Sequence, residues 1–158
     1  MNATRLFATM ALIAAASAAS AQSATQSVTF QVDAINQIAF TGSPSLVINT
    51  ATAGSAPTSA TAGATWAVTT NQTAAKITAS IASVMPAGLT LQVNLSAPAG
   101  GTSAGAQTLG TTAVDVVTGI TKLAQSAISV NYSLAATAAA GVVSSTSRTV
   151  TYTITGGT

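Results

Sequence analysis

Apolar and polar residues alternate over long stretches of this chain, and this period of two limits its fold more than any other feature. The clearest run is residues 89–95 (LTLQVNL), in which every second residue is apolar. The same pattern recurs at residues 28–32, 65–69, 77–81, 128–134 and 149–155. Successive side chains of a β-strand point to opposite faces, so these runs predict strands with one face buried and one in solvent.

The segments between the runs carry turn residues. Residues 85–88 (MPAG) predict the turn of a hairpin between two alternating strands, and residues 138–141 predict the turn of the last hairpin. Shorter strands are expected at residues 38–40, 46–49 and 113–117. About six to nine short strands in one unit predict an all-β fold, a single β-sandwich.

Ionisable groups are almost absent. The chain has no His, Cys or Glu, and charged residues make up 4% of it, against about 25% in an average soluble protein. Its only carboxylates are those of Asp33 and Asp115. Catalysis needs groups that exchange protons, hold metals or attack as activated nucleophiles. We therefore expect no enzyme and no cofactor.

Three sets of residues could nevertheless form sites. Asp33 and Asp115 could contribute to a cation site, but Ca²⁺ takes about 6–8 oxygen ligands, so no metal is predicted. Lys76 and a nearby Ser could form a Ser–Lys nucleophile pair, but Ser is so common in this chain that any Lys would have one nearby. Three aromatic residues on apolar phases of strands predict core packing, with a sugar-stacking platform as the alternative: Trp66, Tyr132 and Tyr152.

The first residues have the form of an export signal. Arg5 precedes the apolar stretch 6–16 (LFATMALIAAA), and residues 19–21 (ASA) match a small-residue cleavage site. We expect a signal peptide at residues 1–21 and a secreted mature chain, extracellular or on the cell surface. Later segments lack the length of apolar sequence that a membrane-spanning helix requires.

The expected mature chain is nearly neutral. Three cations (Lys76, Lys122 and Arg148) and the two Asp carboxylates leave a net charge of +1. No cluster of Lys and Arg offers an electrostatic surface for nucleic acid. So small a charge does little to keep molecules apart, which favours a protein that packs against copies of itself.

An alternating strand stands at the start of the expected mature chain. Residues 22–27 are short and polar, and they lead directly into Val28, Phe30 and Val32, which alternate with polar residues. One interpretation is an ordinary first strand of the sandwich. The other is a donor strand (within residues 22–34) that completes the sheet of the next subunit, with residues 35–158 as the sandwich. Such a head-to-tail contact propagates as a filament.

The chain ends resemble those of bacterial fimbrial subunits and pilin-like coat proteins. The resemblance lies in the signal peptide, the N-terminal alternating strand, and residues 139–143 (AAGVV) followed by the strand 148–155 (RTVTYTIT). It implies an incomplete immunoglobulin-like sandwich that polymerises by strand donation, and it leaves open whether an assembly chaperone escorts the subunit.

These observations predict a structural protein. We expect a subunit of an extracellular filament, a pilus-like or biofilm fibre, whose partner is itself and whose donor strand carries Val28, Phe30 and Val32 at the subunit interface. The alternative is a secreted adhesin or glycan-binding β-sandwich.

Overall fold

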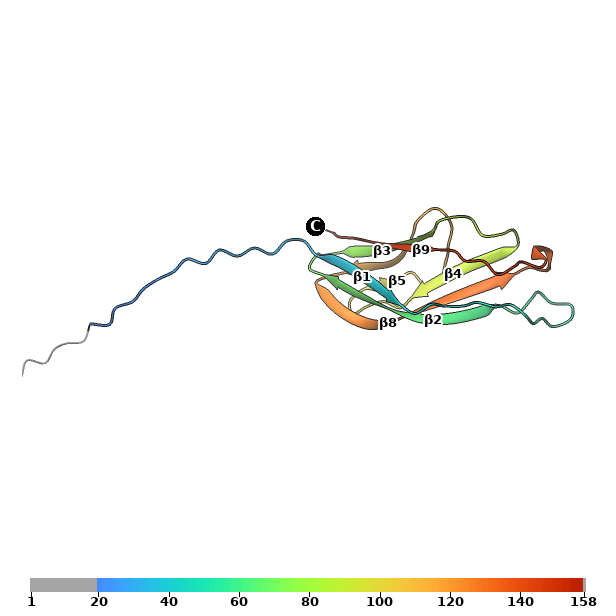
Figure 1. Ribbon diagram of the computed structural model, residues 1–158, viewed down its shortest axis with the longest axis horizontal. Helices are drawn as coiled ribbons and strands as arrows, with labels where there is room; N and C mark the ends of the chain where they lie inside the picture. Colours follow the sequence, from blue (N-terminus) through green and yellow to red (C-terminus); the bar gives the residue numbers. More distant parts are fainter. Residues whose placement is uncertain (1–19, 158) are drawn as a thin grey trace, which may run out of the picture. The chain divides into compact units, whose positions relative to one another are not determined.

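The computed structural model describes residues 20–157 (Figure 1). The predicted signal peptide, residues 1–21, lies almost wholly outside these residues, as does Thr158. The chain divides into two units between Val32 and Asp33. Within residues 20–157, every strand and the one 3-10 turn belong to the second unit.

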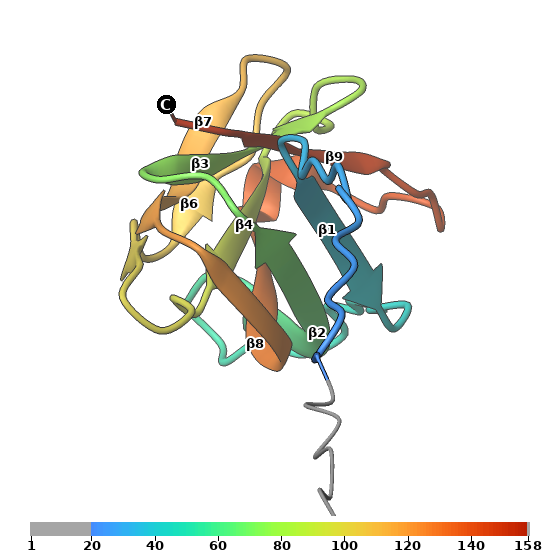
Figure 2. The same cartoon turned by 90° about the vertical axis from the view of Figure 1, so that its left-hand side faces the viewer.

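The second unit is a sandwich of two antiparallel sheets, and Figure 2 shows the two layers nearly end-on. The first sheet has the order β1 (Asn36–Thr41), β2 (Ala60–Thr70), β8 (Leu123–Ala136), β4 (Leu89–Leu95), β6 (Gln107–Thr108). The second has the order β5 (Thr102–Ser103), β7 (Val114–Ile120), β3 (Ala75–Ile81), β9 (Val150–Thr155). A short 3-10 turn, η1 (Ala138–Ala140), follows β8. The prediction of an all-β sandwich is confirmed.

The core lies between the sheets and is built by the apolar phase of each alternating run. In β4, Leu91, Val93 and Leu95 are buried, while Gln92 and Asn94 are not. The predicted inward residues of β2, β3 and β8 are likewise buried, except for the half-buried Leu134: Trp66, Val68, Ile77, Ala79, Ile81, Ile128, Val130 and Tyr132. The period of two therefore assigned the two faces of these strands correctly.

Both predicted hairpins are wrong. Residues 82–88 connect β3 to β4, which belong to different sheets, and residues 137–149 connect β8 to β9, which also lie in different sheets. A Pro/Gly turn has the same local chemistry whether the next strand pairs with its predecessor or crosses to the facing sheet. Both crossings lie at the same end of the sandwich, on the right in Figure 1.

Two predicted strands are absent from the structure. Neither residues 46–49 nor residues 28–32 carry regular secondary structure. The interpretation of residues 28–32 as an ordinary first strand of the sandwich is therefore wrong. The residue pattern decides which side chains can be buried, but a strand also needs a neighbouring strand to pair with its backbone N–H and C=O groups.

The strands β1 and β9 border one side of the sandwich. Among the described residues, β9 pairs only with β3, and β1 pairs only with the second half of β2, from Thr65 to Thr70. The first half of β2 pairs with β8 alone. Beyond the end of β1 the two sheets are consequently open along this side.

Candidate functional site

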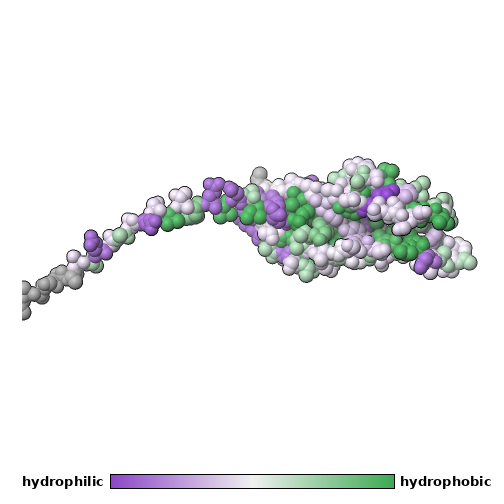
Figure 3. Space-filling model, in the orientation of Figure 1, coloured by the Kyte–Doolittle hydropathy of each residue, from purple (hydrophilic) through white to green (hydrophobic). Residues whose placement is uncertain are grey.

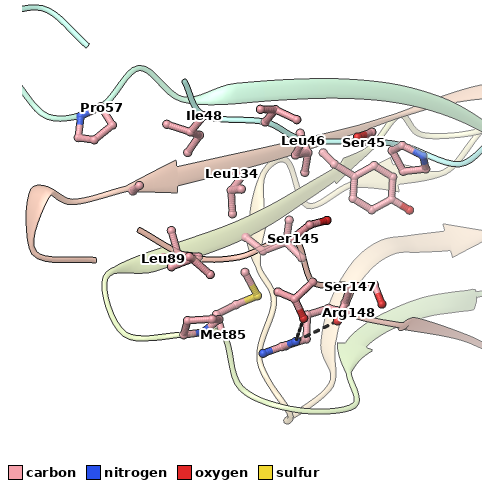
Figure 4. A pocket seen from close by; sticks show the side chains of 18 of the residues that line it. Ser45, Leu46, Ile48, Pro57, Met85, Leu89, Leu134, Ser145, Ser147 and Arg148 are labelled. Atoms are coloured by element: carbon pink, nitrogen blue, oxygen red, sulfur yellow. Dashed lines mark hydrogen bonds between the residues drawn. The ribbon is translucent and has the colours of Figure 1, made fainter. Parts of the chain in front are cut away.

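An apolar groove of about 1230 Å³ occupies the open side of the sandwich. Its floor consists of side chains from β4 and β8, among them Leu89, Leu91 and Leu134. One wall is the extended segment 44–51 and the other is segment 142–149, which leads into β9. In Figure 4 Leu46 and Ile48 come from the first wall, with Leu134 and Leu89 between them and the second wall. Small-molecule sites measure about 300–1,000 Å³, so this groove is larger than most of them.

The first wall, residues 44–51, leaves the sheet at the end of β1. Its far end is closed by a hydrogen bond from the Thr58 amide to the Thr50 carbonyl (2.9 Å) and by a bridge between Ala51 and Pro57. Between these points Leu46 and Ile48 are half-buried, whereas Val47 remains 68% exposed. The wall thus presents alternating side chains without being part of a sheet.

The second wall is fastened by Arg148. Its Nε donates to the Val84 carbonyl (3.2 Å), which ties the wall to the connection between β3 and β4. Its Nη1 donates to the Thr146 hydroxyl (3.3 Å) and the Ser147 carbonyl (2.9 Å), the bonds drawn in Figure 4. Arg148 is the single charged residue that lines the groove among the described residues. Its guanidinium is occupied by these three acceptors.

The base of the second wall depends on a glycine. The Thr137 amide donates to the Gly88 carbonyl (2.9 Å), so the start of the β8–β9 connection lies against the start of β4. Gly88 has a φ of +77°, in the left-handed region that favours glycine. A Cβ there would lie 2.9 Å from the Cα of Ala140 in η1. Only glycine lets η1 approach this closely.

An aromatic cluster closes the inner end of the groove. The rings of Phe40 in β1 and Tyr152 in β9 are stacked with centroids 3.9 Å apart, and the Tyr152 hydroxyl lies 2.8 Å from that of Tyr132 in β8. Burial, and next the hydrogen bond with Tyr132, raise the pKa of Tyr152 well above its ordinary value. The cluster joins the two sheets where their edges come together.

Exposed apolar residues gather around the groove. On the second wall Val142 is fully exposed, and Val143 is 39% exposed. The space-filling view shows hydrophobic surface at this end of the sandwich, on the right in Figure 3. Exposed apolar surface around a concave site is characteristic of interaction surfaces.

The N-terminal segment, residues 20–32, is exposed throughout and has no regular structure. The side chains of Val28, Phe30 and Val32 are exposed by 76%, 89% and 77%. Large apolar side chains at three alternate positions of one segment are costly to leave in water, since burying each is worth about 1.5–3 kcal/mol.

The structure places the remaining sequence candidates away from the groove or in the core. Lys76 and Asp115 form an ion pair of 3.0 Å between β3 and β7, with both side chains 46% exposed. Within residues 20–157, no three side chains of His, Cys, Asp or Glu lie together as metal ligands would. Trp66 is 1% and Tyr132 8% exposed. These two rings are core residues, as their phase predicted, so the proposed sugar platform is not formed.

The groove itself was not found from the sequence. Its walls are the unpaired segment 44–51 and the connection 137–149. The sequence predicted a short strand at residues 46–49 in the first wall and a hairpin turn at residues 138–141 in the second. The usable signal was the length of the two connections that contain these walls, residues 42–59 and 137–149, since connections of more than about 12–15 residues without regular structure are often functional.

No family model, curated protein or solved structure matches this chain. The described residues also include no helix with the length and hydrophobicity needed to cross a bilayer. Fold and site therefore define the class of the protein: a β-sandwich with an open apolar side, preceded by an exposed alternating segment.

Proposed function

We propose that this protein is a secreted structural subunit that polymerises into an extracellular filament, a pilus-like or biofilm fibre. In this proposal the subunit is an incomplete, immunoglobulin-like sandwich, and strand donation between copies completes it. Export is inferred from the predicted signal peptide. The protein needs no cofactor and catalyses no reaction.

The observation that carries the proposal is the exposure of Val28, Phe30 and Val32. Burial of the three side chains in a partner would contribute about 5–9 kcal/mol in all, before the cost of ordering the segment is subtracted. Backbone hydrogen bonds along an added strand would provide further affinity. The nearly neutral chain offers little repulsion between copies.

Truncation tests this function. The chain of residues 22–158 is expected to form regular thin filaments in negative-stain electron microscopy, with strong light scattering. Deletion of residues 22–34 is expected to abolish them, because the apolar segment is gone. Deletion of residues 22–27 alone, which removes only the polar part, should leave elongation intact.

The result that contradicts the proposal is a monodisperse monomer of residues 22–158 at every concentration. Normal filaments from the chain lacking residues 22–34 would retain a structural role but exclude strand donation. A monomer that binds a polysaccharide instead would favour the adhesin alternative.

A further inference from the structure

We propose that the groove of a single copy binds a long-chain carboxylate, an amphipathic anion of the fatty-acid type, with the carboxylate on Arg148 and the alkyl chain along the apolar floor. This inference goes beyond the proposed function and does not depend on polymerisation. Two features of the groove carry it: one wall holds a cation without a counterion, and an apolar floor lies beside that wall.

Arg148 is the cation. Among residues 20–157 it forms no ion pair, and the carboxylate of Asp115 is engaged by Lys76 at 3.0 Å. The three acceptors of the guanidinium are all neutral: the carbonyls of Val84 and Ser147 and the hydroxyl of Thr146. Arg148 is half-buried, and a partly buried cation with neutral partners alone retains a strong attraction for an anion.

The guanidinium is held in place with one edge open. Its hydrogen bonds use Nε and Nη1, and Nη2 has no acceptor within the part of the chain that the structure describes. Because these bonds already fix the group, Nη2 can donate to a carboxylate at little further cost in side-chain entropy. The Thr146 hydroxyl accepts from Nη1, so its own proton is available to the second oxygen of the same carboxylate.

The two sides of the groove differ in polarity. Residues 144–147 (SSTS), which precede Arg148 on the second wall, are exposed hydroxyl residues that line the groove. Figure 4 shows Leu46 and Ile48 on the side of the groove opposite Arg148. A polar wall with one cation and an apolar wall facing it match a ligand with one anionic head and one apolar chain.

The floor fits an alkyl chain. Leu89, Leu91 and Leu134 line it, and the groove volume of about 1230 Å³ leaves room for a long chain. Each CH₂ group that is buried on binding should raise the affinity by about fourfold. Acetate has the same head but almost no chain, so it should show no measurable binding at concentrations that saturate the groove with a long-chain acid.

Isothermal titration calorimetry of residues 22–158, below the concentration at which light scattering begins, tests the inference. Dodecanoate should bind more tightly than decanoate or octanoate, by up to about fourfold for each CH₂ group. Dodecanol, with the same chain and a neutral head, should bind about tenfold more weakly than dodecanoate because it forms no charge-assisted hydrogen bond. Dodecyltrimethylammonium, whose head is a cation, should bind more weakly still.

Variants test the position of the head group. Arg148→Gln should lower the affinity for dodecanoate by about tenfold and leave that for dodecanol nearly unchanged. Thr146→Val, at an exposed position, should act in the same direction and serves where Arg148→Gln fails to fold. Lys122→Gln is the matched control: it removes one positive charge as well, but Lys122 does not line the groove, so both affinities should stay unchanged.

A spectroscopic readout reports on the contact directly. Arg148 is the single Arg of residues 22–158, so the NMR signals of its side-chain N–H groups need no further assignment. They should shift on addition of dodecanoate and much less on addition of dodecanol.

The outcomes separate this inference from the proposed function. An equal loss of affinity for dodecanoate and dodecanol in Arg148→Gln would show that Arg148 only holds the wall, and equal affinities for the anion, the alcohol and the cation would show general apolar adsorption. Either result overturns the inference, as does the absence of dodecanoate binding. Filaments of the unmodified chain without dodecanoate binding contradict this inference alone, whereas dodecanoate binding by a chain that stays monomeric at every concentration supports it and contradicts the proposed function.

Discussion

Replacement of Gly88 by Ala tests how the second wall of the groove is held. At φ = +77° an L-residue in the left-handed region costs about 1–2 kcal/mol. The added Cβ would also lie 2.9 Å from both the Cα and the Cβ of Ala140 and 2.8 Å from the Thr137 hydroxyl. The Cα of Ala140 belongs to the backbone and cannot rotate away, so overpacking adds about 1–3 kcal/mol. The expected loss of unfolding free energy is about 2–5 kcal/mol.

Gly100→Ala is the matched control. Gly100 has nearly the same φ, +75°, but an added Cβ there would have no heavy atom within 4 Å. Only the backbone term of about 1–2 kcal/mol applies. With an m value of about 2 kcal/mol per molar urea, the midpoint should fall by about 1–2.5 M for Gly88→Ala and by about 0.5–1 M for Gly100→Ala.

Equal midpoints for the two variants would refute this reasoning, since they would show that the approach of η1 to Gly88 carries no energy. A second readout concerns assembly. Under conditions in which both variants remain folded, Gly88→Ala should slow polymerisation, because the displaced η1 lies at the base of the groove wall. Gly100→Ala should polymerise at the rate of the unmodified chain.

Two further predictions concern stability. Because burial raises the pKa of Tyr152, the fold favours the neutral phenol: this contribution is complete below about pH 10 and is lost as the pH rises further, by up to about 1.4 kcal/mol per pH unit. Tyr152→Phe should remove that alkaline loss of stability, and it should cost about 1 kcal/mol at pH 7 through the lost hydrogen bond to Tyr132. Both effects are measured by denaturation at fixed pH values. An unchanged dependence of the unfolding free energy on pH above about pH 10 would contradict the prediction. Ala127→Gly should raise the free energy of unfolding by about 0.5–1 kcal/mol, because Ala127 has a φ of +56° beside the irregular pairing of β2 with β8. A lower thermal unfolding midpoint for this variant would contradict the prediction.

The predicted fold and the observed one agree where local alternation decides the structure. Residues 89–95 were predicted as a strand and form β4 with the same bounds, because three buried aliphatic side chains on one face leave a single favourable register. Residues 46–49 (LVIN) were predicted as a short strand and form none, because no neighbour offers its backbone groups. The two-residue strands β5 and β6 carry too few residues for any periodic signal.

The amino-acid sequence by itself determined that this protein is all-β, which faces of its long strands are buried, and that its ionisable groups are few. These properties depend on residue type and on a spacing of two, both of which are local. Only the tertiary structure decided that residues 82–88 and 137–149 cross between the sheets and that the sandwich is left open beyond β1, between segments 44–51 and 142–149. Which segment pairs with a strand edge depends on the competition of distant segments for backbone hydrogen bonds and core volume. The local sequence around a strand therefore does not predict its pairing partner.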